Sequence, residues 1–224
     1  MSTGVAGRRI AAVVFDLGGV VLGSPLHAIA RFEREHAIPP GFVNRLVVSS
    51  GPSGAWSRLE RGELDLEAFA DAFGAECARA GCRVPARALM ERIAAGSQPR
   101  PMMLAAVARI RARGLLAAAL TNNWSGGSDA SRSLRERFDV FVESCAIGLR
   151  KPDPRIYQHL LERLGCPARE TAFLDDIGRN LKPARELGMA TIRVEEPDRA
   201  LAELEALLGF PLRGSNDPPP GERP

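Results

Sequence analysis

The sequence predicts an α/β fold in which a parallel β-sheet is interrupted, after its first strand, by a helical insertion. Short apolar runs alternate with helical patterns along most of the 224-residue chain. Such alternation is typical of βαβ units arranged around a parallel sheet. Residues 24–99 break the alternation, because they contain helical patterns and loops but no strand pattern. The simplest interpretation is one α/β core with helices inserted into it.

Five short runs predict the strands of the sheet. Each is predominantly apolar and β-rich, as expected for a central parallel strand that is covered on both faces. The runs occupy residues 10–15, 115–120, 140–142, 171–174 and 190–194. In open α/β sheets the ligand crevice lies beyond the carboxyl ends of the strands. Polar clusters follow these runs, so we expect the functional site at that edge.

Helical patterns complete the predicted architecture. Between the strands they occupy residues 102–113, 131–137, 154–164, 180–187 and 198–208, and within the insertion residues 27–36, 66–80 and 86–95. We expect the core to comprise residues 8–22 and 100–212, with a helical cap at 23–99. The Pro- and Gly-rich residues 213–224 are expected to form a disordered tail. A mobile glycine-containing loop is expected at residues 126–128.

Composition excludes several classes of protein. A net charge of only +3 gives no reason to expect a nucleic-acid groove, and the scattered arginines are better explained as solvated helix faces. Four cysteines without a CxxC pair favour neither a zinc site nor a disulfide framework. The apolar run at 10–15 is too short to span a membrane. We therefore expect a cytoplasmic protein.

Asp16 is the first candidate site residue. It follows the first predicted strand and precedes Gly18 and Gly19, which allow the backbone to approach a ligand closely. A carboxylate at this position can attack phosphorus and form an acyl-phosphate. An aspartate that only caps a turn is the alternative, and this motif alone does not decide between them.

Two further strand-end clusters offer groups that suit a phosphate. Thr121 and Asn122 end the second predicted strand, where hydroxyl, amide and backbone N–H groups can bind phosphoryl oxygens. Lys151 could hold Asp16 ionised and neutralise charge on a transferring group. A strand-end turn and a surface lysine are the corresponding alternatives, and the neighbouring Arg150 competes with Lys151 for the same role.

Asp175 and Asp176 are adjacent at the end of the fourth predicted strand. Adjacent carboxylates in an apolar setting repel each other unless a cation lies near them. Magnesium prefers one or two carboxylates together with water and substrate phosphate. An Asx-type turn with a cap for the helix from Asn180 is the alternative. With Asp16 at a neighbouring strand end, the pair predicts a Mg²⁺ site.

Taken in order, the motifs FDLGG, LTNN, RKPDP and FLDDIGRN resemble the four motifs of the haloacid dehalogenase (HAD) superfamily. Residues 121–124, 141–145, 173–189 and the segment 51–63 further resemble the N-terminal phosphatase domain of soluble epoxide hydrolase. HAD domains fused to some acyl-CoA dehydrogenases are equally similar. The resemblance covers residues 10–212. The sequence stops where the bifunctional enzymes would continue into an α/β-hydrolase domain, so no epoxide hydrolysis is expected.

The resemblance implies a Rossmannoid core with an inserted helical cap of the C1 type, and a magnesium-dependent phosphatase. Its implied roles can be carried over position by position. Asp16 matches the nucleophile and a metal ligand, and Gly18 matches the metal ligand that binds through its backbone carbonyl. Thr121 and Asn122 match the phosphate-binding pair, and Lys151 matches the charge-balancing lysine. Asp176 matches the acidic metal ligand, with Asp175 beside it, and Asn180 matches a supporting position.

One position departs from the family pattern. Phosphatases of the family usually carry a second aspartate two residues after the nucleophile as general acid and base, and here that residue is Gly18. A positioned acid contributes ~10²–10⁴-fold in rate. Three hypotheses follow: a phosphatase that uses another proton donor, an impaired module that binds a phosphorylated ligand or a partner, and a 2-haloacid dehalogenase. The two adjacent aspartates argue against the last, which needs no metal.

The expected substrate is a small phosphorylated molecule held between cap and core, and a lipid phosphate is one candidate. Trp56, Phe69, Phe73 and Met90 could line an apolar pocket. At helical spacing, however, Phe69 and Phe73 more often pack between helices. Trp124 is the aromatic residue expected nearest the ligand. The sequence does not indicate an oligomeric state.

Overall fold

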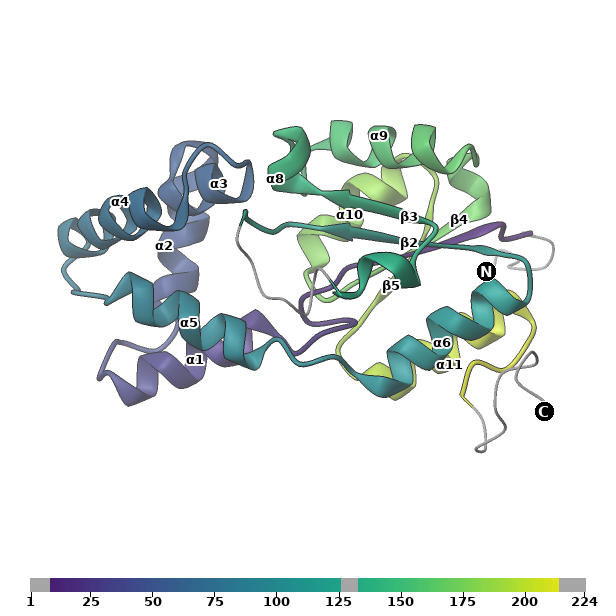
Figure 1. Cartoon of the computed structure of the whole chain (residues 1–224), viewed down its shortest axis with the longest axis horizontal. Coiled ribbons are helices and arrows are strands. Elements are labelled where there is room, and N and C mark those ends of the chain that lie inside the picture. The colour runs from purple at the N-terminus through teal and green to yellow at the C-terminus, as the bar shows by residue number, and fades with distance from the viewer. Residues whose placement is uncertain (1–8, 126–132, 214–224) are drawn as a thin grey trace, which may run out of the picture.

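The computed structural model describes residues 9–125 and 133–213, and its centre is a five-stranded parallel sheet of order β3-β2-β1-β4-β5 (Figure 1). The strands are β1 (Ala12–Phe15), β2 (Leu116–Thr121), β3 (Val140–Glu143), β4 (Thr171–Asp175) and β5 (Ala190–Arg193). Each lies within two residues of its predicted ends. Phe15 pairs in register with Ala119 and with Leu174. Asp16 and Asp175 therefore leave the sheet at the same level.

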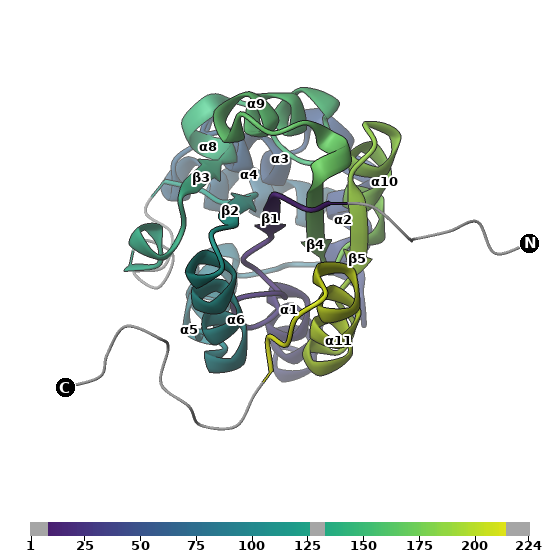
Figure 2. The same ribbon diagram turned by 90° about the vertical axis from the view of Figure 1, so that its right-hand side faces the viewer.

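Helices cover both faces of this sheet, which explains why its central strands β1, β2 and β4 are buried and predominantly apolar. The helices α6 (Pro101–Ala112) and α11 (Pro197–Leu208) pack on the face that carries Val13 and Phe15. The opposite face, with Ala12 and Val14, packs against α9 (Pro154–Leu164) and α10 (Gly178–Glu186). Figure 2 shows this arrangement end-on, with α9 above the strands and α6 and α11 below them.

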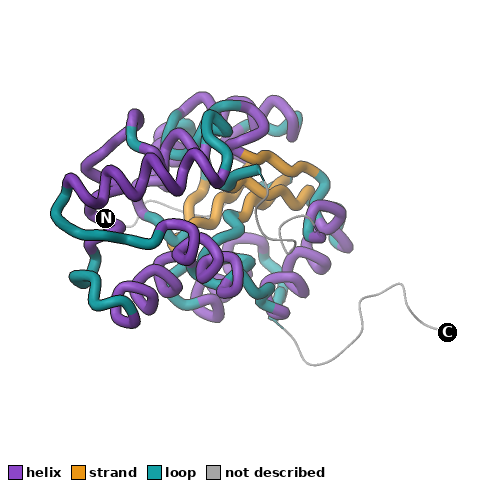
Figure 3. The backbone as a smooth tube through the Cα atoms, turned by 60° about the vertical axis from the view of Figure 1, so that its left-hand side comes forward, coloured by secondary structure: helices purple, strands orange, loops and turns teal. Residues whose placement is uncertain are grey.

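The insertion forms a helical cap with its own apolar interior. Its helices are α1 (Pro25–Glu35), α2 (Phe42–Ser50), α3 (Ala55–Glu60), α4 (Leu66–Arg79) and α5 (Ala86–Gly96), with a 3₁₀ turn, η1, at Gly51–Ser53. Phe69 and Phe73 are fully buried and stack with ring centroids 5.2 Å apart. They form part of the cap interior, as the packing interpretation predicted. In Figure 3 the strands lie together in the core, and the cap consists of helices and loops.

Several short elements differ from the sequence predictions. Helices α2 and α3 were not predicted, because their sequences lie between glycine- and proline-rich turns. The helix predicted at residues 131–137 is described from Ser133 onwards. Ser133 is helical, but Arg135–Arg137 forms a 3₁₀ turn, η2, before Phe138 turns extended, so the prediction is wrong at its C-terminal end. The four-residue helix α8 (Ser144–Ile147) and the 3₁₀ turn η3 (Ala168–Glu170) are too short to show a periodic pattern.

Some expectations fall outside the described residues. The loop expected at residues 126–128 lies there, and so do residues 214–224 of the expected tail. Arg213 is described, and its guanidinium pairs with Glu205 at 2.6 Å. Among the described residues, no helix combines the length and the apolar character that a bilayer crossing requires.

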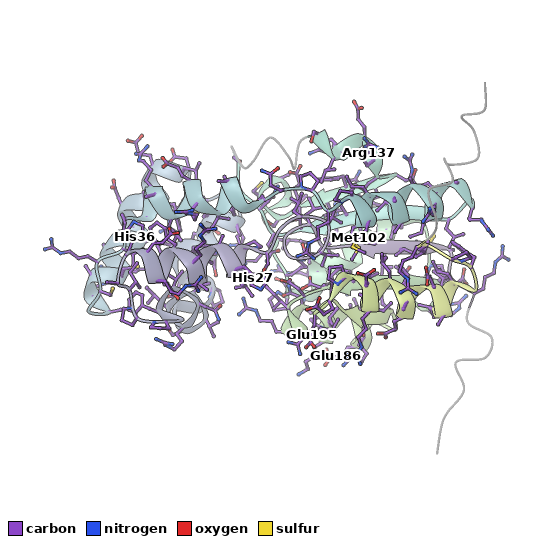
Figure 4. All side chains as sticks on the ribbon, turned by 90° about the horizontal axis from the view of Figure 1, so that it is seen from below. His27, His36, Met102, Arg137, Glu186 and Glu195 are labelled. Atoms are coloured by element: carbon purple, nitrogen blue, oxygen red, sulfur yellow. The ribbon has the colours of Figure 1, made fainter. Side chains whose placement is uncertain are left out.

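Two antiparallel connections join the cap to the core. Gly23 N donates to Gln98 O at 2.9 Å, and Arg100 N donates to Val21 O at 2.8 Å. A β-carbon on Gly23 would lie 2.1 Å from the carbonyl oxygen of Gly96, so the close approach requires glycine there. Figure 4 labels His27 on the first turn of α1, at the end of that helix which adjoins the core.

Candidate functional site

Asp16 lies immediately after β1, at the carboxyl edge of the sheet, and is buried. Its Oδ1 accepts a hydrogen bond from Leu17 N at 2.7 Å and lies 2.9 Å from Lys151 Nζ. The pKa of Asp16 is raised to about 8, chiefly by burial, because Lys151 offsets the effects of burial and of neighbouring Asp175 and Asp176 only in part. The carboxylate is thus held in a fixed orientation in a site that is rich in negative charge.

Lys151 reaches from the loop before α9 into this buried site. Its side chain is 1% exposed, and Nζ lies 2.7 Å from Asp175 Oδ2 and 2.9 Å from the carbonyl oxygen of Leu120. Burial alone would lower the pKa of Lys151, but the charges of Asp16 and Asp175 outweigh it, and the pKa is raised. Arg150, the competing candidate, points towards the cap instead. Lys151 is therefore the cation beside Asp16.

Asp175 is fully buried, and protein donors occupy both of its oxygens. Besides Lys151 Nζ on Oδ2, Ile177 N donates to Oδ1 at 2.8 Å. Asn180 Nδ2 lies 3.0 and 3.1 Å from the two oxygens. Asn180 is fixed in turn, because its carbonyl oxygen accepts the Tyr157 hydroxyl at 2.6 Å. Asp175 thus orients Lys151 and has little capacity left for another ligand.

Asp176 differs sharply from its neighbour. Its Oδ1 is buried and has no hydrogen-bond partner among the described residues. One carboxylate oxygen each from Asp16, Asp175 and Asp176 lie within 4.8 Å of one another. Burial, followed by the charge of Asp175, raises the pKa of Asp176 to about 6. Three clustered carboxylates around one lysine leave excess negative charge, which suits a divalent cation bound by hard oxygen ligands.

The predicted phosphate-binding pair divides into two different environments. Asn122 lines the same cavity as Asp16, but its amide holds the lysine loop: Oδ1 accepts from Lys151 N at 2.8 Å, and Nδ2 donates to Lys151 O at 3.1 Å. Thr121 ends β2, is buried, and is not among the residues that line the cavity. Asn122 therefore joins the predicted residues at the cavity, whereas Thr121 lies behind it.

A small cavity of about 110 Å³ lies between the cap and the carboxyl edge of the sheet. Asp16, Gly18, Lys151, Asp176 and Asn180 contribute to its polar floor. Apolar cap side chains form the opposite wall. Of the residues predicted for an apolar pocket, Trp56 borders the cavity, and so does Trp124. Phe69, Phe73 and Met90 belong to the cap interior instead. The wall also includes Leu26, Ile29, Val43, Val47 and Ile93.

The structure adds site residues that sequence reasoning did not single out. Glu60, on α3 of the cap, lines the cavity and contacts Arg150 and Asn122 of the core. Arg179, on the first turn of α10, lies at the cavity as well. Glu60 belongs to a helix that was not predicted. The only signal at this position was the resemblance over residues 51–63, which gave the glutamate no role.

The chain is similar to several known proteins. A family model described as haloacid dehalogenase-like hydrolase matches residues 10–188. Acyl-CoA dehydrogenase family member 10 from Mus musculus is 43% identical over 211 residues, which are 92% of this chain and 20% of that protein. Bifunctional epoxide hydrolase 2 from Sus scrofa is 36% identical over 225 residues, covering 93% of this chain and 40% of that protein. The chain spans at most 40% of the length of these two relatives.

A solved structure with the same fold is a HAD family enzyme from Bacteroides thetaiotaomicron in complex with magnesium and inorganic phosphate. Its TM-score is 0.58 at 22% identity, and the match covers 82% of this chain and 93% of that one. At this identity the match supports the fold: a parallel sheet whose carboxyl edge faces a helical cap.

Proposed function

We propose that this chain, which belongs to the haloacid dehalogenase-like hydrolase family, is a magnesium-dependent phosphatase that acts through an aspartyl-phosphate on Asp16. The proposal assigns residues 8–22 and 100–212 to the catalytic core and 23–99 to the cap. The observation that carries it is the constellation of Asp16, Lys151 and Asp176 around one cavity.

The residues present fit a magnesium ion. The buried Oδ1 of Asp176 has no hydrogen-bond partner among the described residues, and a bound cation would remove the cost of this unpaired acceptor. Asp16 and Asp176 would hold the ion through their carboxylates, and Gly18 through its carbonyl. Asp175, although part of the acidic cluster, is assigned to orienting Lys151, because protein donors occupy both of its oxygens. When bound, Mg²⁺ would offset the charge of these carboxylates and of the phosphoryl group.

The chain's own residues account for the steps of the reaction. Leu17 N and Lys151 Nζ hold Asp16 Oδ1, so the carboxylate is oriented before the substrate arrives. An Asp16 oxygen attacks phosphorus in line, and the bond between phosphorus and the ester oxygen breaks. The leaving oxygen takes its proton from a water molecule, since position 18 carries no acid, and departs as the alcohol. Lys151 neutralises charge that develops on the phosphoryl oxygens. Water then attacks phosphorus, which releases inorganic phosphate and restores Asp16.

The cavity supports a phosphomonoester whose organic part is apolar, with a lipid phosphate as one candidate. Asn122, with Lys151, is assigned to the phosphate end, and Thr121 to supporting that strand end from behind. The apolar wall from Ile29, Val43 and Trp56 faces the rest of the substrate. The cavity is smaller than the ~300–1,000 Å³ of sites for drug-sized ligands, so a substrate of that size requires the cap to open.

A second candidate function follows from Gly18, which stands where an acid–base aspartate is usual in the family's phosphatases. The chain would then bind a phosphorylated ligand or a partner around Asp16 without efficient turnover. Installing an acid at this position, as in Gly18→Asp, separates the two functions.

The primary test is hydrolysis of p-nitrophenyl phosphate with and without Mg²⁺. We expect turnover that requires the metal and falls at least ~10³-fold in Asp16→Asn, because the amide is not a nucleophile. Phosphate bound to acid-quenched wild-type protein, and absent from Asp16→Asn, would identify the intermediate. Turnover that survives both the removal of Mg²⁺ and Asp16→Asn would overturn the mechanism.

A further inference from the structure

Glu60 is a charged cap residue that is almost completely buried, with 8% of its surface exposed. It is the last residue of α3, the cap helix that contacts α8 of the core (Figure 1). The backbone approaches closely at the same place: a β-carbon on Gly62 would lie 2.5 Å from the carbonyl oxygen of Cys145 in α8. Glu60 thus lies at a contact between cap and core, on the border of the cavity that contains Asp16.

The two carboxylate oxygens of Glu60 contact different parts of the molecule. Oε1 accepts a hydrogen bond from Trp56 Nε1 of the cap at 3.1 Å. Oε2 accepts from the guanidinium of Arg150, at 2.5 Å, and from Asn122 Nδ2, at 3.3 Å, both in the core. Arg150 Nη1 also donates to Ser57 Oγ of α3 at 3.0 Å. One carboxylate therefore joins a cap helix to two core loops.

Those two core loops are the ones that hold the catalytic lysine. Arg150 immediately precedes Lys151 in the chain, and the amide of Asn122 bonds both the N–H and the carbonyl of Lys151. Direct hydrogen bonds and one peptide unit therefore connect Glu60 to the backbone of Lys151, from which the side chain reaches Asp16. A displacement of α3 would release the Arg150 guanidinium and break one of the hydrogen bonds that orient the Asn122 amide.

A buried ion pair of this kind is a poor source of net stability, because removing two charges from water costs about as much as their attraction returns. It does specify geometry, since neither partner tolerates the loss of the other. An apolar pair of similar size would join cap and core equally well. The pair of Glu60 and Arg150 is therefore better explained as fixing the position of the cap relative to the lysine loop.

We propose that Glu60 is a positioning residue: its contacts with Arg150 and Asn122 form when the cap closes and set the Lys151 loop in its catalytic arrangement. This role rests on the proposed function of the Asp16 site. It deepens that function, because cap closure over a substrate and assembly of the charged floor become one event. An open cap, in which α3 has left the core, would leave Arg150 and Asn122 free to rearrange.

The first test is hydrogen–deuterium exchange, which does not depend on turnover. Glu60→Gln preserves size but replaces one oxygen with an amide group, so it cannot accept hydrogen bonds on both sides. We expect faster exchange in residues 55–62 of the cap and, together with it, in residues 148–152 of the core, while strands β1 and β4 keep their slow exchange. This pattern separates a local opening from the general loss of stability that breaking a buried ion pair brings. The matched control is Glu63→Gln, because the ion pairs that the described residues give Glu63 join it to Arg58 and Arg61 of the same cap segment.

The second test is a double-mutant cycle on p-nitrophenyl phosphate turnover. Glu60→Gln and Arg150→Met should each lower kcat by ~10-fold, since displacing a catalytic group by a fraction of an ångström has effects of this order. The double variant should be no slower than the worse single variant, because both changes break one contact. Multiplicative losses of about a hundredfold would show two independent defects and overturn the proposal.

The two proposals fail in different ways. If Asp16→Asn leaves turnover intact while Glu60→Gln still raises exchange in both segments, the mechanism is wrong and the coupling of cap to core stands. If Asp16→Asn abolishes turnover but Glu60→Gln changes neither exchange in residues 148–152 nor kcat, the phosphatase stands and the positioning role is wrong. Increased exchange confined to the cap would also overturn the positioning role, since such a result would show that Glu60 stabilises α3 alone.

Discussion

The carboxylate of Asp176 lies in the space that a side chain on Gly19 would need. A β-carbon built on Gly19 would be 2.0 Å from Asp176 Oδ2 and 2.4 Å from Cγ, and the φ angle of Gly19 is +85°. Two independent requirements therefore demand glycine here: the left-handed backbone conformation and the close approach of the carboxylate. The second glycine of the FDLGG motif thus defines where Asp176 can lie.

Gly19→Ala should disrupt the proposed Mg²⁺ site while the fold survives. The new methyl group must displace Asp176, and the backbone at φ +85° is strained for alanine. We expect the affinity for Mg²⁺ to fall by at least ~10-fold, with a loss of stability of ~1–3 kcal/mol. Isothermal titration with Mg²⁺ and urea unfolding measure the two effects. Gly74→Ala is the control, because a β-carbon there meets no atom within 4 Å.

Lys151→Met should destabilise the protein strongly. It leaves Asp16 and Asp175 buried without their cation, and breaking a buried pair costs ~3–5 kcal/mol. The chain offers a natural control in Lys182, which is 76% exposed and lies 3.9 Å from Glu186. Lys182→Met should change stability by less than ~0.5 kcal/mol. Equal urea midpoints for the two variants would contradict the structural role of Lys151.

Asp175→Asn and Asp176→Asn are an isosteric pair with opposite expected effects. Asp175 accepts hydrogen bonds from Lys151, Ile177 and Asn180, so its neutralisation should lower the melting temperature of the metal-free protein. Asp176 has a buried oxygen without a partner, so its neutralisation should raise that temperature and remove Mg²⁺ binding. Thermal unfolding with and without Mg²⁺ distinguishes them. Identical behaviour would refute the division of roles.

Stabilisation by Mg²⁺ should increase with pH. Burial raises the pKa of Asp16 to about 8 and of Asp176 to about 6, both from 3.8. Between pH 3.8, the ordinary pKa of an aspartate, and about pH 8, the folded chain binds more protons than the unfolded chain. The stability of the metal-free protein therefore falls as pH rises through this window. Mg²⁺ requires the ionised carboxylates, and its melting shift should be larger near pH 8 than near pH 5.5. Asp176→Asn should make the shift small at both values.

Gly18→Asp should raise phosphatase turnover only when the site accommodates it. A β-carbon there would lie 3.0 Å from Pro25 Cγ and 3.2 Å from Cδ, so the proline must give way. We expect Gly18→Asp alone to raise kcat modestly. Combined with Pro25→Ala it should raise kcat further, towards ~10²-fold, which is the lower limit for the contribution of a general acid. Measurement of kcat for an alkyl phosphate, a poor leaving group, is the sensitive assay. No gain in either background would favour a binding role or another acid.

The sequence predicted the elements whose pattern is local. All five strands are present, because a strand that is buried on both faces must be apolar along its length. Helix α9 (Pro154–Leu164) was predicted residue for residue, since its proline start and glycine end are encoded in the chain. The cap helices α2 and α3 were missed. They are short and follow glycine- or proline-rich turns, and their formation depends on packing within the cap.

From the sequence alone we predicted the α/β class, the insertion after the first strand, Asp16 and the two aspartates at strand ends, and Lys151 ahead of a helix. These features follow from hydrophobic periodicity and from the order of motifs along the chain. The three-dimensional arrangement was needed to show that Lys151 rather than Arg150 faces Asp16, and that Glu60 reaches across from the cap. Neighbouring residues in a loop have equivalent patterns, and the direction of each side chain depends on contacts with residues far away in the chain.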